Sequence, residues 1–198
     1  MPRPYRLGAR AAQVQGTRDR IIEAAIELCT EVGISAATMR EIGSRADVAP
    51  GTLRNHFATR EDLDRAMVER LTSEVPPPGL SIFDGTHSVE ERLESVIRAG
   101  GTFMDEGRRL YLMWLREPML TGAWAGKAAE YGAKWLELMR TALGPLAGDE
   151  EAMAILRAVI NPAFFESVRA GRRSTDEASA LVTAVVVPWF AARARGRA

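Results

Sequence analysis

The 198-residue sequence predicts an all-α protein, and three observations support this fold class. No stretch of useful length alternates apolar and polar residues as a half-buried strand does. Apolar residues instead recur at helical spacing along most of the chain. Helix starts are marked by capping boxes, in which a Ser or Thr precedes a Glu by three positions, at Thr38 and Glu41, Ser88 and Glu91, and Ser174 and Glu177.

Residues 38–63 predict two short helices and the start of a third, joined by tight turns. The first helix begins after Thr38 and ends at Asp47, because Asp tolerates turn geometry better than most residues. Pro50 fits the first turn of the second helix, where a missing amide hydrogen costs nothing. The third helix begins at Arg60, after a capping Thr.

The second of these helices has a polar outer side. Leu53 and Phe57, four positions apart, form its inward stripe, and Thr52, Arg54, Asn55 and His56 lie outside. This is the pattern of a helix-turn-helix, whose second helix enters the DNA major groove. Arg pairs there with guanine, Asn with adenine, and Thr with base or phosphate, which predicts base contacts by Thr52, Arg54 and Asn55. The predicted phosphate contacts are Thr38, Arg40, His56 and Arg60. Solvated side chains are the alternative interpretation for both Arg40 and Arg54.

Residues 17–63 resemble the tetracycline-repressor (TetR) family of bacterial regulators. The resemblance is carried by a spaced set: Ile21, Ile22, Ala25, Leu28, Val32, Gly33, Thr38, Ile42, Ala46, Val48, Gly51, Thr52, Leu53, His56, Phe57, Arg60 and Leu63. The family usually has Gly where Asp47 stands, Ser or Thr at Ala49, Tyr at Arg54, and often Lys at Arg60. The resemblance implies a three-helix DNA-binding domain followed by a helical domain that binds a small molecule and dimerises.

The chain is predicted to divide into a basic arm at residues 1–16, a DNA-binding domain at residues 17–63, and a ligand-binding and dimerisation domain at residues 64–198. The first twenty residues carry Arg3, Arg6, Arg10, Arg18 and Arg20 against a single Asp19. This charge suits an arm that lies along DNA phosphates or in a minor groove, and a solvated tail fits it equally well.

The C-terminal part predicts further helices separated by prolines and glycines. The run at residues 76–79 ends the helix that begins at Arg60, and Gly144 and Pro145 end another. Residues 149–170 predict one helix, and the capping box at Ser174 opens the last. Both of these helices have wide apolar stripes, which predicts pairing with a second copy of the chain in a four-helix bundle. A core within a single chain is the alternative.

A ligand cavity is expected among the helices after residue 100. The residues predicted to line it are Phe103, Tyr111, Trp114, Trp135, Met139, Asn161 and Phe164. Each aromatic or Met side chain taken singly fits a plain core, but the family resemblance places a small-molecule cavity here, and such cavities are mostly apolar. Asn161 is the polar candidate, because Pro162 removes a helical hydrogen bond beside it.

Composition excludes several classes of function. The 26 Lys and Arg residues balance the 26 Asp and Glu residues, so the overall charge does not indicate nucleic acid. The single Cys29 and two histidines, His56 and His87, offer no metal cluster or nucleophile–base pair. With no glycine-rich phosphate loop either, neither an enzyme nor a cofactor is expected. The chain also lacks a long apolar run and a secretion signal, which predicts a cytoplasmic protein.

The sequence therefore predicts a cytoplasmic, ligand-responsive transcriptional regulator. A repressor that binds a palindromic operator as a dimer, and that a small apolar or aromatic effector releases, fits the pattern best. The alternative is a helical dimer that binds small molecules or proteins without reading DNA sequence, which the departures at Asp47, Ala49 and Arg54 leave open.

Overall fold

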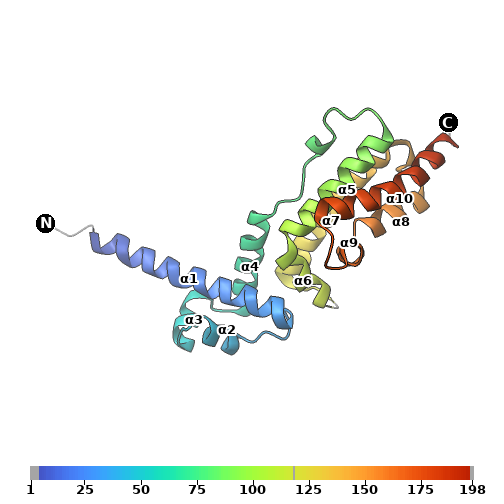
Figure 1. Ribbon diagram of the computed structural model, residues 1–198. Helices are drawn as coiled ribbons and strands as arrows, with labels where there is room; N and C mark the ends of the chain where they lie inside the picture. The colour runs from blue at the N-terminus through green and yellow to red at the C-terminus, as the bar shows by residue number, and fades with distance from the viewer. Residues whose placement is uncertain (1–4, 118, 197–198) are drawn as a thin grey trace. The chain divides into compact units, whose positions relative to one another are not determined.

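The computed structural model describes residues 5–117 and 119–196, and this part of the chain contains helices, turns and no strand (Figure 1). The predicted all-α fold class is confirmed. The elements are α1 (Tyr5–Val32), α2 (Met39–Arg45), α3 (Pro50–His56), α4 (Arg60–Glu74), the 3₁₀ turn η1 (Leu80–Phe83), α5 (Val89–Glu106), α6 (Arg108–Arg116), α7 (Gly122–Leu143), the 3₁₀ turn η2 (Gly144–Leu146), α8 (Glu150–Val159), α9 (Pro162–Arg169) and α10 (Thr175–Arg195).

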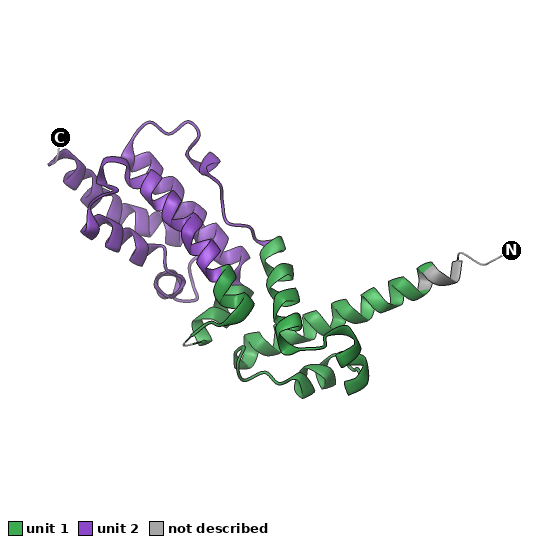
Figure 2. Cartoon of the chain, turned by 180° about the vertical axis from the view of Figure 1, so that it is seen from behind, with its two compact units in different colours: residues 1–74, 109–127 green, residues 75–108, 128–198 purple. Residues whose placement is uncertain are grey.

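Internal contacts divide the chain into two compact units (Figure 2). Unit 1 contains residues 1–74 and 109–127, and unit 2 contains residues 75–108 and 128–198. This division differs from the predicted boundary after residue 63. All of α4 belongs to unit 1, because its apolar side, including Met67 and Leu71, is buried there. Most of α6 joins the same unit through contacts that local sequence spacing does not reveal.

Local chemistry in unit 1 starts and stops the helices where the sequence predicts. Thr38 is the N-cap of α2 and forms the predicted capping box with Glu41. Asp47 has a φ of 51°, which lies in the left-handed region that favours glycine. Pro50 is the first residue of α3. Ala49, the N-cap of this helix, forms no side-chain capping hydrogen bond. The start of α3 therefore depends on Pro50 and on packing.

The first helix is longer than predicted. Helix α1 begins at Tyr5 and runs without a break into the DNA-binding domain, so residues 5–16 are its first turns and not a separate arm. Ala, Arg and Gln have high helix propensity and outweigh the cost of Gly8 and Gly16. Arg10 is exposed on this extension, whereas Arg3 lies outside the described residues.

Unit 2 is built on the pairing of α5 with α10. The two helices approach closely at Gly101, where an added Cβ would lie 2.5 Å from Ser179 Oγ and 2.7 Å from the Phe165 ring. Its core contains Leu93, Val96, Leu138, Met139, Leu156 and Phe190. By length and mean hydropathy (1.2), α10 is apolar enough to cross a membrane, but it serves here as a packed helix of this core.

The prediction of one helix over residues 149–170 is wrong. The chain forms α8 and α9, and Ile160 and Asn161 interrupt the helical conformation between them. Pro162 explains the break, because a proline disfavours helical geometry in the residue before it and supplies no amide hydrogen. The last helix, α10, begins at the capping box that Ser174 and Glu177 form, as predicted.

Candidate DNA interface and ligand cavity

Helix α3 presents the predicted base-reading residues on the surface of unit 1. Leu53 and Phe57 anchor it, with 4% and 1% of their surfaces exposed. The guanidinium of Arg18, on α1, lies over the Phe57 ring at 4.7 Å from its centroid and adds a cation–π contact. Arg54 and Asn55 are exposed, so α3 is held from its inner side and leaves polar groups free for a partner. Thr52 and His56 are half-buried beside them.

A hollow of about 660 Å³ lies between α2, α3 and the start of α4. Three arginines line it, Arg40, Arg54 and Arg60, and its lining contains no carboxylate. Arg40 and Arg54 are both exposed, which brings two cations from different helices to one depression. Such a concentration of positive charge attracts phosphate, although the chain as a whole is neutral. Thr38 is exposed at the N-cap of α2.

Arg60 has a structural role that the sequence did not indicate. Its Nε donates to Asp64 Oδ1 at 2.7 Å, Nη2 donates to the Ile34 carbonyl at 2.8 Å, and Nη1 donates to the Ala37 carbonyl. The guanidinium thus joins the first turn of α4 to the loop between α1 and α2. These bonds engage three of the five N–H donors of Arg60 within the protein, which gives it a structural role, and its contact with a phosphate stays a prediction. Buried next to it, the Cys29 thiol has its pKa raised to about 11, chiefly by desolvation.

A bidentate ion pair fixes α2 against α1. Arg45 donates from Nη1 and Nη2 to the two carboxylate oxygens of Glu31, each at 2.6 Å. These bonds lower the pKa of Glu31 and raise that of Arg45. Both side chains are solvent-exposed, so the pair adds little to the stability of the fold and serves mainly to orient α2 against α1. It sets the position of α2, and with it the position of Arg40.

Contacts from α6 and the start of α7 complete unit 1. Glu117 accepts from the Ser35 amide and from its hydroxyl, both at 2.9 Å. Glu61 of α4 accepts from the Ala123 amide at 3.1 Å, at the start of α7. Sequence reasoning missed these bonds because Ser35 and Glu117 are 82 positions apart. No local pattern signals a partner at that distance.

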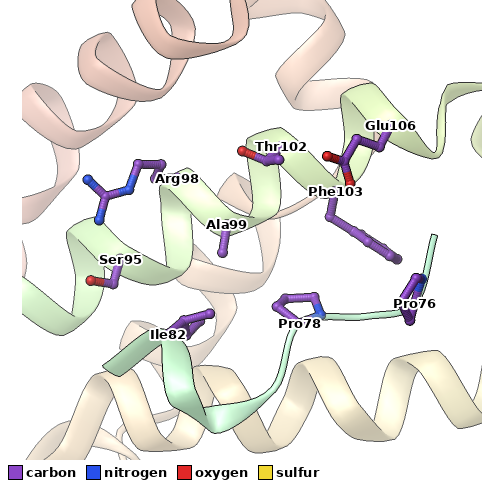
Figure 3. A pocket seen from close by; sticks show the side chains of 9 residues that line it. All are labelled: Pro76, Pro78, Ile82, Ser95, Arg98, Ala99, Thr102, Phe103 and Glu106. Carbon is purple, nitrogen blue, oxygen red and sulfur yellow. The ribbon is translucent and has the colours of Figure 1, made fainter. Parts of the chain in front are cut away.

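Unit 2 contains a cavity of about 360 Å³ between the connector after α4 and helix α5 (Figure 3). Pro76, Pro78 and Ile82 form one side. Along α5, the opposite side carries Ser95, Arg98, Ala99, Thr102, Phe103 and Glu106, as Figure 3 shows. The cavity therefore combines apolar walls with hydroxyl and charged groups, as small-molecule sites do.

Of the residues predicted to line a ligand cavity, the structure places Phe103 in this one. The Trp135 ring packs against Phe103, with the centroids 5.3 Å apart, and supports that wall from behind. Met139 is 5% exposed and belongs to the core of unit 2. The Tyr131 hydroxyl, not singled out from the sequence, donates to the Val75 carbonyl at 3.1 Å and ties α7 to the connector.

The other predicted ligand residues lie elsewhere, and each position has a local cause. Tyr111 and Trp114 are on the part of α6 that belongs to unit 1, where their rings meet edge to face. Asn161 is the N-cap of α9, so its Oδ1 accepts from the Ala163 amide at 2.9 Å. Phe164 is 38% exposed, because the break before α9 turns the neighbouring Phe165 inward instead.

Comparison with known proteins matches residues 21–67 to the family described as bacterial regulatory proteins of the tetR family. A curated relative, the HTH-type transcriptional regulator UidR of Escherichia coli (strain K12), is 34% identical over 89 residues. The match covers 43% of each of the two chains, so it spans less than half the length of this relative. The family match at residues 21–67 includes the helix-turn-helix.

Solved structures share the fold over most of the chain. A TetR-like transcriptional regulator from Rhodococcus sp. RHA1 has a TM-score of 0.67 and 18% identity, over 89% of this chain and 96% of that one. AibR, crystallised with isovaleryl coenzyme A and operator DNA, has a TM-score of 0.66 and 15% identity, over 87% and 98%. At these identities the likeness establishes the fold alone.

Proposed function

We propose that this chain, whose N-terminal domain belongs to the tetR family of bacterial regulatory proteins, is a ligand-responsive, DNA-binding transcriptional regulator. The observation that carries the proposal is the outer side of α3, which presents Arg54 and Asn55 beside the arginine-lined hollow. We infer that the protein represses transcription in the cytoplasm by binding a palindromic operator as a dimer.

Within this proposal each polar residue of the interface has a role. Arg54 and Asn55 carry the side chains that pair bidentately with guanine and adenine, and they are the base-reading residues together with Thr52. The phosphate contacts are Arg40, which lines the same hollow as Arg54, Thr38 at the start of α2, and His56 at the end of α3. The extension of α1 that carries Arg10 adds positive charge, which favours a further contact with the phosphate backbone of DNA.

We propose the unit 2 cavity as the effector site. Its apolar walls fit a small apolar or aromatic group, and Arg98 and Glu106 offer a cation and a carboxylate to the polar end of a ligand. The isovaleryl coenzyme A bound to AibR combines an apolar acyl group with phosphates. An acyl thioester of this type is therefore a suitable first probe. An effector lowers operator affinity only if it binds the DNA-incompetent form more tightly.

We propose that α10 forms the dimer interface. Leu181 and Val185 are 42% and 67% exposed on this helix, which also buries Val182 and Phe190 in the core of unit 2. Exposed aliphatic side chains one turn apart form an apolar stripe that a second copy of the chain covers in a two-fold arrangement. Val159 is only 5% exposed and belongs to the core of unit 2. It is therefore no part of the proposed interface.

Val185→Glu is expected to convert the dimer into monomers, because the carboxylate would be buried twice at a two-fold interface without a partner. Sedimentation equilibrium measures the change in mass. Ala133→Glu adds the same charge at an exposed position of α7 and is the matched control, expected to remain a dimer. A Val185→Glu protein that sediments as a dimer like the control would place the interface elsewhere.

The DNA-binding function is tested by selecting duplexes from a random pool with the purified protein. We expect enrichment of an inverted repeat and an affinity that falls steeply with rising salt, because several phosphate contacts release counterions. A pool that stays random at every salt concentration would favour the second candidate, a helical small-molecule or protein-binding module without sequence-specific DNA binding.

A further inference from the structure

Unit 1 holds a second cavity, of about 430 Å³, that the proposed function does not use. The loop after α1, helix α4, the residues after α6 and the start of α7 enclose it. Its lining includes Ile34, Asp64, Glu117, Leu120, Thr121 and Trp124. All of them belong to the unit that carries the helix-turn-helix. The volume is within the range of small-molecule sites.

Trp124 lines this cavity and carries an unused, buried hydrogen-bond donor. Its side chain is 2% exposed, and its Nε1 has no hydrogen-bond partner among the described residues. A buried indole N–H normally finds a partner, because leaving the donor unpaired costs about 1–3 kcal/mol. A ligand that brings an acceptor into the cavity recovers this energy. The indole ring at the same time supplies an apolar wall.

The charges of the cavity select against an anion. Asp64, 9% exposed, and Glu117 are two carboxylates against the single guanidinium of Arg60. Arg60 already donates to Asp64, and Glu117 accepts both bonds from Ser35. An anionic ligand would meet net negative charge here. A carboxylate such as Asp64, however, accepts more than one hydrogen bond, so a neutral donor is favoured.

A hydroxyl group satisfies both requirements, because its oxygen accepts from an N–H while its proton is donated to a carboxylate. The remaining walls, including Ile34 and Leu120, are apolar and suit a flat hydrocarbon body. We propose that this cavity binds a small uncharged aromatic alcohol or phenol, with its hydroxyl on Trp124 Nε1 and a lining carboxylate. This site is separate from the effector site proposed in unit 2.

The test uses the full-length protein with ¹⁵N-labelled tryptophan and no DNA, so its outcome is independent of the proposed function. The four tryptophans give four indole N–H signals, and the Trp124 signal is identified by its loss in Trp124→Phe. The corresponding variants of the other three tryptophans give the same assignment by elimination. The probes are 2-naphthol, naphthalene and the anion 2-naphthoate, which differ in the hydroxyl and in charge.

We expect 2-naphthol to displace the Trp124 signal saturably and to bind about tenfold more tightly than naphthalene, the factor that one recovered hydrogen bond provides. We expect 2-naphthoate to leave the signal in place. Trp124→Phe should reduce the affinity for 2-naphthol by a similar factor, whereas Trp189→Phe, in unit 2, should leave it unchanged. An unmoved Trp124 signal, equal affinities for 2-naphthol and naphthalene, or displacement of the Trp135 signal alone would overturn the proposal.

Discussion

Replacing Arg60 with Met is expected to lower the free energy of unfolding by about 2–4 kcal/mol, because a half-buried ion pair loses its cation and two carbonyls lose their donor. The Asp64 carboxylate, 9% exposed, would lose its partner. The carbonyls of Ile34 and Ala37 would also lose the bonds that hold the loop before α2. The change should therefore loosen the helix-turn-helix as a whole.

Urea unfolding followed by far-ultraviolet circular dichroism measures this loss. Arg65→Met is the matched control, because Arg65 lies on the same helix but forms exposed ion pairs with Glu61 and Asp62. Such pairs contribute only about 0–1 kcal/mol. Adding Asp64→Leu to Arg60→Met should recover part of the stability by removing the unpaired charge. Equal losses for Arg60→Met and Arg65→Met would show that the Arg60 bonds carry little energy.

Gly101→Ala is expected to destabilise unit 2, against the usual rule for helices. In a helix interior this exchange normally stabilises by about 0.5–1 kcal/mol, since Gly loses more backbone freedom on folding. At Gly101 the new Cβ would lie 2.5 Å from Ser179 Oγ and 2.7 Å from the Phe165 ring. Overpacking of this kind costs about 1–3 kcal/mol, so the sign reverses.

Gly132→Ala provides the matched control for the helical rule. It lies on α7, is exposed, and an added Cβ there would meet nothing within 4 Å. Thermal unfolding should place Gly101→Ala below the parent protein and Gly132→Ala above it. Ser179→Gly, combined with Gly101→Ala, should recover part of the loss. A stabilised Gly101→Ala protein would show that α5 and α10 pack less closely than described.

The sequence predicts the helix starts well because capping is a short-range effect. Thr38, Ser88 and Ser174 each form the capping box that their spacing with a following Glu indicates. The inward stripe of α3 is equally local. The break between α8 and α9 also has a local signal, since Pro162 disfavours helix in the residue before it, but the apolar stripe that continues across it favours a single helix.

Long-range contacts account for what the sequence does not predict. Arg60 has the side chain and the position of a phosphate contact, and only the folded loop shows that it also donates to the carbonyls of Ile34 and Ala37. The bonds of Glu117 to Ser35 join positions far apart in the chain. The candidate ligand residues show the same limit. Aromatic residues at helical spacing fit a core and a cavity equally well, and packing decides between them.

If α3 reads DNA sequence, Arg54→Ala should remove part of that readout. On the duplex enriched from the random pool, dissociation constants are measured for the parent protein, Arg54→Ala and Arg40→Ala against every symmetric base-pair change. We expect Arg54→Ala to cost about 1–3 kcal/mol and to abolish discrimination at one symmetric position, while Arg40→Ala weakens binding to all duplexes alike. Uniform loss of affinity in both variants, with discrimination intact at every position, would show that Arg54 does not read a base.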